Sequence, residues 1–302
     1  GILKVEKGFL LVAGGAGYIG SHTCKLLAAN GYRPIVLDNL STGHREAVRW
    51  GPLINGEIAD SALVRRIVRK YAIDSVLHFA ADAIVGESVR DPRKYFRNNV
   101  SATLAFLDTL LAGGVKRIIF SSTCAVYGLP EAETIGETAP QHPVNPYGES
   151  KLFIERVLRW YEKVYGLSWV SLRYFNAAGA DPGGELGERH HPETHLIPLA
   201  IGAALGLNGP LEVCGADYPT ADGTPVRDYV HVTDVAQAHV LALEHLLRGR
   251  SSGAFNLGTG RGHSVMDVIR CAERVGGCPV PFHLAERRPG DPPRLVADPT
   301  LT

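Results

Sequence analysis

The stretch Phe9–Gly31, FLLVAGGAGYIGSHTCKLLAANG, decides the fold of this chain. Its first five residues are apolar and predict a buried strand, and the spacing of residues 18–30 predicts a helix that ends at Gly31. Between them lies the GxxGxxG turn formed by Gly14, Gly17 and Gly20. Glycines let the backbone turn tightly and approach a pyrophosphate, which then sits on the helix N-terminus. This unit therefore predicts an α/β domain that binds a dinucleotide.

The end of the next apolar run bears on the choice of cofactor. Residues 34–37 are apolar and Asp38 follows them, 18 residues after Gly20. A glycine triplet alone also fits a strand–helix turn without a ligand. A carboxylate at this place can accept hydrogen bonds from ribose hydroxyls and repels a 2′-phosphate. The pair of signals favours NAD over NADP.

The first half of the chain alternates strand and helix patterns. Strands are predicted over 73–80, 117–120 and 169–172, and helices over 61–71, 91–111 and 145–165. Such alternation indicates a parallel sheet with helices on both faces. After Phe175 the chain becomes rich in Gly, Pro and charge, and a loop is expected over 177–192.

The predicted fold class is therefore α/β, a Rossmann-type doubly wound parallel sheet with a smaller C-terminal substrate-binding lobe. We expect the NAD-binding domain over 8–175, with about 228–260 packing back onto it. The substrate-binding lobe is expected over 176–302.

Composition limits the classes of partner. Lys plus Arg and Asp plus Glu both number 31, so the net charge is zero, and neither a nucleic-acid nor a membrane partner is expected. The five cysteines are odd in number and form no CxxC pair, which favours reduced thiols in a cytoplasmic protein. Because neither Cys nor His shows ligand spacing, no metal site is expected, and His190–His191 is interpreted as a loop pair.

A second chemical signal is Tyr147-Gly148-Glu149-Ser150-Lys151, which places Tyr147 and Lys151 one helical turn apart on one face. A nearby ammonium stabilises a phenolate and can make Tyr a base. An ordinary amphipathic helix would also fit this pair. Thr123 closes the run Ser121-Ser122-Thr123 at the end of a predicted strand, the edge at which open parallel sheets bind ligands.

Together, these motifs resemble the extended short-chain dehydrogenases/reductases, in which GxxGxxG, Ser/Thr and YxxxK follow in this order. The chain is most similar to the UDP-galactose (UDP-glucose) 4-epimerases, and the similarity runs from Phe9 to Asp298. It includes GGAGYIGSHT at 14–23, RYFNAAGA at 173–180 and the long YPTADGTPVRDYVHV at 218–232.

The resemblance implies NAD-dependent epimerisation at C4 of a UDP-hexose through a 4-keto intermediate. Thr123, Tyr147 and Lys151 would be the catalytic triad, with Tyr147 as the acid/base on the sugar 4-hydroxyl. Lys151 would hold the nicotinamide ribose and lower the pKa of Tyr147. The implied cofactor-binding residues are Gly14, Gly17, Tyr18, Ile19, Gly20, Asp38, Asn39, Glu57, Ile58, Phe79, Ala80, Ala81, Asn98, Tyr147, Lys151 and Phe175.

For the UDP-sugar, the resemblance implies contacts with Thr123, Asn176, His195, Leu196, Arg227, Arg288, Asp291 and Leu295. Glu57 and His195 stand where some relatives place Asp and Asn, and both keep the ability to form hydrogen bonds. Leu295 would face the sugar 2-substituent, which predicts UDP-galactose and UDP-glucose as the main pair and weaker turnover of the N-acetyl pair.

The resemblance also implies a homodimer, because relatives pair the helix over 146–165 and the preceding helix across a two-fold axis. Relatives continue beyond Asp298 with terminal helices, so the C-terminal end is expected to be truncated relative to the family.

Four other interpretations remain open, and the first is another nucleotide-sugar epimerase of the same fold. A 4,6-dehydratase of this fold would carry acidic residues directly after Thr123, where this chain has Cys124 and Ala125. A dehydrogenase with exchangeable NAD and a non-catalytic NAD-binding regulator would share the glycine turn. The regulator would have no use for Tyr147 and Lys151 together.

Overall fold

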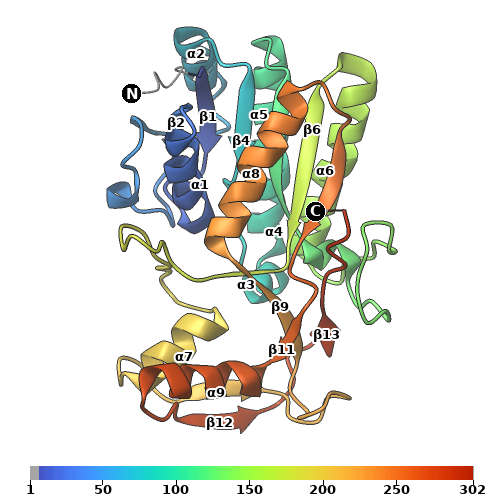
Figure 1. Ribbon diagram of the computed structural model, residues 1–302. Coiled ribbons are helices and arrows are strands. Elements are labelled where there is room, and N and C mark those ends of the chain that lie inside the picture. The colour runs from blue at the N-terminus through green and yellow to red at the C-terminus, as the bar shows by residue number, and fades with distance from the viewer. Residues whose placement is uncertain (1–6, 302) are drawn as a thin grey trace.

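The computed structural model describes residues 7–301 and contains a seven-stranded parallel sheet in the order β10-β6-β5-β4-β1-β2-β3 (Figure 1). The strands are β1 (Phe9–Ala13), β2 (Arg33–Asp38), β3 (Leu53–Asn55), β4 (Ser75–His78), β5 (Arg117–Thr123), β6 (Ser168–Tyr174) and β10 (Gly253–Leu257). Helices cover both faces, so the prediction of a Rossmann-type doubly wound sheet is confirmed.

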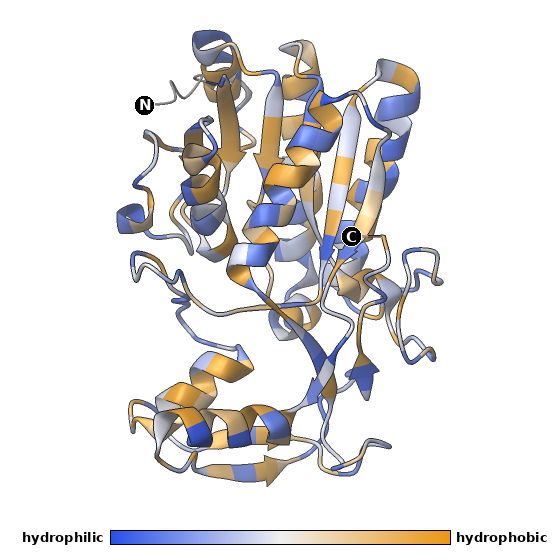
Figure 2. Cartoon of the chain, viewed as in Figure 1, coloured by the Kyte–Doolittle hydropathy of each residue, from blue (hydrophilic) through white to orange (hydrophobic). Residues whose placement is uncertain are grey.

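The two faces of the sheet bury separate sets of side chains because successive residues of a strand point in opposite directions. In β1, Leu11 and Ala13 pack under α2 (Ser61–Tyr71), α5 (Ala102–Ala112) and α6 (Pro146–Tyr165). Leu10 and Val12 pack on the other face, under α1 (Tyr18–Ala29) and α8 (Val232–Leu247). Accordingly, Figure 2 shows apolar strands in the middle of the sheet and helices of mixed character.

The helix that carries Tyr147 and Lys151 begins and ends as its sequence predicts. The Asn145 side chain accepts a hydrogen bond from the Gly148 N–H at 2.8 Å, and Pro146 occupies the first turn. At the other end, Gly166 adopts a left-handed conformation with φ 72°.

A smaller unit lies beyond the carboxyl edge of the sheet (Figure 1). Its strands are β7 (Asn176–Ala178), β8 (Leu211–Cys214), β9 (Val226–His231), β11 (Gly262–Ser264), β12 (Phe282–Ala285) and β13 (Arg294–Leu295). Helices α7 (Leu196–Ala204) and α9 (Val265–Gly276) pack together over a core of their own. The loop predicted over 177–192 is wrong at its start, because Ala177 and Ala178 pair in β7 with β9.

The chain returns from the smaller unit to the sheet and then leaves it again. After β9, α8 packs beside α1 on one face of the sheet. β10 then extends the sheet next to β6, pairing Gly253–Leu257 with Val170–Tyr174. In residues 7–301 we find no helix that is both long enough and apolar enough to cross a membrane.

A buried ion pair joins α6 to the sheet. The guanidinium of Arg173 in β6 contacts both carboxylate oxygens of Glu155, with Nη2 at 2.6 Å and Nε at 3.0 Å. Ser122 donates to the same carboxylate at 2.6 Å, and Arg173 Nη1 donates to the Tyr127 hydroxyl at 2.8 Å. Both charged side chains are almost completely buried, at 1% and 0% exposure.

Asp228 joins β9 to two later segments. Its fully buried carboxylate accepts hydrogen bonds from the Thr259 N–H and hydroxyl, each at 2.8 Å. It also accepts from the backbone N–H groups of Gly260 at 2.9 Å and Ala297 at 3.1 Å. One carboxylate thus fixes the turn after β10 and the segment after β13 against β9.

Removing one charge of the buried pair should be costly. In Glu155→Gln the guanidinium of Arg173 would stay buried without its counter-charge, which typically costs about 3–5 kcal/mol. We expect the free energy of unfolding, measured in urea, to fall by that amount. Glu149→Gln is the matched control, because Glu149 is exposed on the same helix; an equal loss in both variants would contradict the role of the pair.

Candidate functional site

The candidate site lies at the carboxyl edge of the large sheet. The glycine turn follows β1, Asp38 ends β2, Phe79 follows β4, Thr123 ends β5 and Phe175 follows β6. Carboxyl ends of neighbouring parallel strands meet at one edge, which is where open α/β sheets bind ligands. The structure therefore brings together residues that are far apart in sequence.

The surroundings of the three motif glycines differ in how much room they leave for a side chain. Gly14 has φ +81°, and a Cβ there would lie 2.5 Å from the Ala80 nitrogen. A Cβ on Gly20 would lie 2.4 Å from the Gly14 oxygen. A Cβ on Gly17 would meet only the Gly14 oxygen at 3.4 Å, an ordinary contact. Packing thus requires Gly14 and Gly20, whereas Gly17 leaves room for a ligand.

The start of α1 offers this ligand a favourable site. Gly17 is its N-cap and supplies no side-chain hydrogen bond to the first turn. The N–H groups of a first helical turn point outward and, with the helix dipole, attract an anion. The open space at Gly17 and the start of α1 together fit the pyrophosphate of a dinucleotide.

Asp38 fastens the glycine turn to the end of β2. One carboxylate oxygen accepts from the Ala16 N–H at 2.9 Å and the other from the Leu40 N–H at 2.8 Å. Each carboxylate oxygen can accept more than one hydrogen bond, so capacity for a ribose hydroxyl remains. Asn39 donates to the Glu57 carboxylate at 3.2 Å, and Ile58 is buried beside them.

Lys151 is buried between α6 and β5, and the half-buried Tyr147 lies one helical turn before it. The ammonium of Lys151 donates to the Ser121 carbonyl oxygen at 2.9 Å. Burial lowers the pKa of Lys151 to about 7, although Asp82 acts in the opposite direction. Thr123 accepts a hydrogen bond from the Ala125 N–H at 3.1 Å, which leaves its hydroxyl proton available for another partner.

The surroundings of the Tyr147 phenol favour its neutral form. Burial raises its pKa to about 12, and the Thr123 hydroxyl opposes this only in part. The expectation that Lys151 lowers this pKa stays a prediction, because burial is the largest effect on the phenol here. A dry environment favours the neutral phenol, and it also reduces the charged fraction of Lys151 at neutral pH.

Asn98 lies in a segment that departs from the helix expected over 91–111. After α4 (Pro92–Tyr95) the turns widen into a π-helical stretch, Phe96–Ser101, before α5 begins. Such stretches interrupt the regular hydrogen bonding of an α-helix and are frequent at functional sites. Here the exposed Asn98 donates to Asp82 at 2.6 Å, whereas the buried Asn99 holds the Asp82 backbone.

The remaining cofactor candidates line the same edge. The N–H groups of Phe79 and Ala80 both donate to the Ala13 carbonyl oxygen, at 2.7 and 3.1 Å. The Tyr18 hydroxyl donates to the Gly179 carbonyl oxygen, which ties the glycine turn to the segment after β7. Ala81 follows Ala80 directly and is half-buried.

Several candidate substrate residues gather around β9. Arg227 forms an ion pair with Asp291, and Leu295 pairs with Arg227 in the strand register. Asn176 in β7 lies opposite Tyr229 of β9. Leu295 also packs against the buried cluster that contains Phe175 and Cys124.

The other candidate substrate residues lie further out. Arg288 is exposed, and its backbone oxygen accepts from the Asp291 N–H at 3.2 Å. Leu196 begins α7, and His195 is its N-cap. The ring of His195 contacts Glu188 and Glu193.

Comparisons with known proteins agree with this arrangement. Residues 10–258 match the model of the NAD dependent epimerase/dehydratase family. The chain belongs to this family. A UDP-glucose 4-epimerase of Rhizobium leguminosarum bv. trifolii is 53% identical over 289 residues, 96% of this chain and 88% of the relative.

Two solved structures extend the comparison. The UDP-glucose 4-epimerase from Brucella ovis in complex with NAD has a TM-score of 0.95 and 55% identity, covering 98% of this chain and 91% of its own. The UDP-glucose 4-epimerase from Stenotrophomonas maltophila, with bound NAD and formylated UDP-arabinopyranose, has a TM-score of 0.94 and 40% identity. It covers 98% of this chain and 91% of its own. The resemblance inferred from the sequence motifs is thus confirmed.

Within this family member, the sequence motifs missed a buried pair behind the site. The Tyr174 hydroxyl and His239 Nε2 are 2.6 Å apart, and His239 Nδ1 faces the Val235 carbonyl oxygen at 2.8 Å. The His239 ring also contacts Phe79, with centroids 4.7 Å apart. Tyr174 belongs to the RYFNAAGA motif, which was the one feature of the sequence that could have indicated this pair. His239 comes from α8, which is distant in sequence.

The glycine turn yields a test of the cofactor assignment. In Gly17→Ala the new methyl group has room within the chain but would occupy the space assigned to the ligand. We expect unchanged unfolding of the NAD-free protein and a Kd for NAD raised by at least about tenfold, or roughly 1.4 kcal/mol, measured by fluorescence titration.

Gly14→Ala provides the contrast, because its strained φ and backbone clash should lower stability itself. Equal NAD affinity in Gly17→Ala and wild type would contradict the proposed place of the ligand.

Proposed function

We propose that this chain catalyses the NAD-dependent, reversible epimerisation of UDP-galactose and UDP-glucose at C4. The observation that carries the proposal is the position of the half-buried Tyr147 and the buried Lys151 and Thr123 at the sheet edge that also holds the glycine turn. The two solved relatives named above, which are UDP-glucose 4-epimerases with NAD bound, support it.

The chain's residues suit a cofactor that stays bound. Gly14, Gly17 and Gly20 with the start of α1 would hold the pyrophosphate, Asp38 the adenosine ribose, and Lys151 the nicotinamide ribose. NAD, when bound, supplies a reversible hydride acceptor with a positively charged ring. We assign residues 8–175 and about 228–260 to cofactor binding and residues 176–302 to substrate binding.

Tyr147 would exchange a proton with the sugar 4-hydroxyl while C4 is oxidised to a ketone and then reduced on its other face. The Thr123 hydroxyl can donate a hydrogen bond to the phenol oxygen, because its own oxygen already accepts from Ala125. The charged form of Lys151 would stabilise the phenolate. Both groups therefore favour the ionised form that burial disfavours.

The substrate residues match the charge of a diphosphate. Arg227 and Arg288 can bind phosphate oxygens through charge-assisted hydrogen bonds. Asp291 holds Arg227 in an ion pair and the Val226 carbonyl oxygen accepts from its Nη1, which orients the guanidinium and leaves its remaining N–H groups for a ligand. Asn176 and the first turn of α7, at His195 and Leu196, complete the proposed UDP-sugar site.

The residues after Thr123 argue against an elimination step. A dehydratase needs an acid and a base near C5 and C6 of the sugar. Here Cys124 is buried, and burial raises the pKa of its thiol to about 11, so it stays neutral. Ala125 carries no functional group. We therefore infer epimerisation without loss of water.

Deleting the phenolic oxygen should abolish most activity. We expect Tyr147→Phe to keep its fold and bound NAD but to convert UDP-galactose to UDP-glucose about 10²–10⁴-fold more slowly, the usual range for a general acid–base group. The assay contains no added NAD. Tyr161→Phe on the same helix is the control, because that hydroxyl contacts Asp108 away from the site; a Tyr147→Phe rate within threefold of wild type would remove Tyr147 from the mechanism.

Leu295 would limit the size of the sugar 2-substituent. Leu is smaller than Tyr by about four side-chain heavy atoms, and an acetamido group exceeds a hydroxyl by about three, so the volumes roughly balance. We expect weak turnover of UDP-N-acetylglucosamine by wild type, and its further loss relative to UDP-glucose in Leu295→Tyr. Unchanged relative rates in kcat/KM measurements would show that Leu295 only packs against Phe175.

We also propose a homodimer formed through α6. Phe153, Trp160 and Val164 share one face of this helix and are 42%, 62% and 63% exposed. We expect a dimeric mass by light scattering at micromolar concentration and a monomeric mass for Trp160→Glu. A monomeric wild type would contradict the proposal.

The five free cysteines support a cytoplasmic, reducing location.

A further inference from the structure

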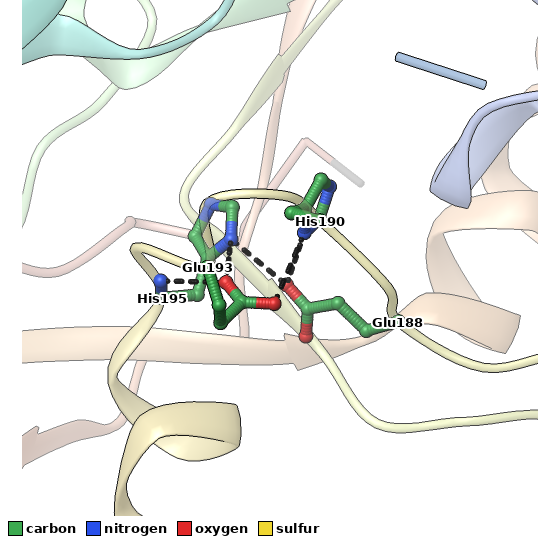
Figure 3. Close-up of side chains that lie close together, drawn as sticks. All are labelled: Glu188, His190, Glu193 and His195. Atoms are coloured by element: carbon green, nitrogen blue, oxygen red, sulfur yellow. Dashed lines mark hydrogen bonds and ion pairs between the residues drawn. The ribbon is translucent and has the colours of Figure 1, made fainter. Parts of the chain in front are cut away.

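A cluster of metal-binding side chains lies in the segment between β7 and α7. Glu188, His190, Glu193 and His195 each contribute one ligand atom, and these atoms lie within 4.8 Å of one another. Figure 3 shows both imidazoles turned toward the two carboxylates. Because the four residues fall within eight positions of one loop, its local conformation alone assembles the cluster.

The spacing of the ligand atoms fits a small cation. His195 Nδ1 is 2.9 Å from Glu188 and 3.2 Å from Glu193, and His190 Nδ1 is 3.5 and 3.4 Å from the same carboxylates. Ligands about 2.0–2.1 Å from a tetrahedral zinc ion lie roughly 3.3 Å from one another. The four distances are near this value, but His190 faces Oε2 of Glu193 and His195 faces Oε1, so this carboxylate would turn or bind through both oxygens when an ion enters.

The two carboxylates of the cluster have little exposure to solvent. The side chains of Glu188 and Glu193 are only 9% and 20% exposed. Within the part of the chain that the structure describes, their ion-pair partners are the two imidazoles alone. The nearby Arg189 pairs instead with Glu46. The contact with Glu188 raises the pKa of His195, so a divalent cation would displace a proton from that ring as it neutralises the two carboxylates.

We propose that Glu188, His190, Glu193 and His195 bind one divalent cation of the zinc class. Two imidazole nitrogens and two carboxylate oxygens suit zinc, whereas magnesium and calcium prefer ligands that are all oxygen. The spacing ExHxxExH is not helical, which is why the sequence predicted no metal here.

The ion would act on the position of a loop rather than on the reacting atoms. His190 lies against Tyr18 of α1, with ring centroids 6.0 Å apart, and His195 caps α7. Four ligands from residues 188–195 would fix this segment between the glycine turn and α7. The evidence for the ion is the cluster alone, and one of its four ligands, His195, also belongs to the proposed UDP-sugar site.

Calorimetric titration of the tag-free holoenzyme with zinc chloride, after treatment with EDTA and dialysis, tests the proposal. We expect one zinc ion per chain. His190→Ala should weaken binding by at least about 100-fold, because even loss of an outer partner of a metal ligand costs about 10–100-fold. His191→Ala is the matched control, since the neighbouring His191 is exposed and outside the cluster.

A second variant and a second measurement keep the outcome decisive. Glu188→Gln should also weaken zinc binding, and zinc should slow amide hydrogen exchange over 181–195 in wild type but not in His190→Ala. Cys271→Ser guards against binding at the exposed thiol and should bind zinc like wild type. The proposal is overturned if one equivalent does not bind, or if His190→Ala binds as wild type does.

Discussion

The buried contact between Arg173 and Glu155 is the interaction on which the site depends. It joins β6 to α6 one helical turn beyond Lys151, and through Ser122 it reaches the residue before Thr123. Two charges in a dry interior are expensive unless their hydrogen bonds are satisfied, and here Tyr127 and the Glu137 carbonyl oxygen take up remaining donors of the guanidinium. The pair thus fixes the helix that carries Tyr147 relative to the strand that carries Thr123.

Much of the large domain follows from local sequence. The glycine turn, Asp38 and the helix with Tyr147 and Lys151 were predicted because glycine conformation, capping residues and apolar spacing act within a few residues. The π-helical stretch at Phe96–Ser101 was not, because its residues read as ordinary helix. The same is true of the start of β7, whose strand character comes only from pairing with β9.

The pKa values of the site residues were the property that sequence motifs predicted least well. A Tyr and a Lys four residues apart suggest a lowered phenol pKa, yet burial of the whole site raises it and lowers that of Lys151. Since the unfolded chain takes up a proton that buried Lys151 resists, this group lowers stability increasingly as pH falls from about 10.5 to about 7. Arg173, Asp228 and His239 likewise gain their roles from partners far away in sequence.

The return of the chain to the large sheet through α8 and β10 has a consequence for folding. The edge strand of the large sheet is made from residues 253–257. The sheet therefore lacks its last strand until the chain has passed through β7, α7, β8 and β9. The core of the smaller unit needs α9, which follows β10 along the chain. Neither unit can therefore mature before the other has been largely synthesised. Contacts of such long sequence separation are formed late, so we expect the two units to fold together rather than one after the other.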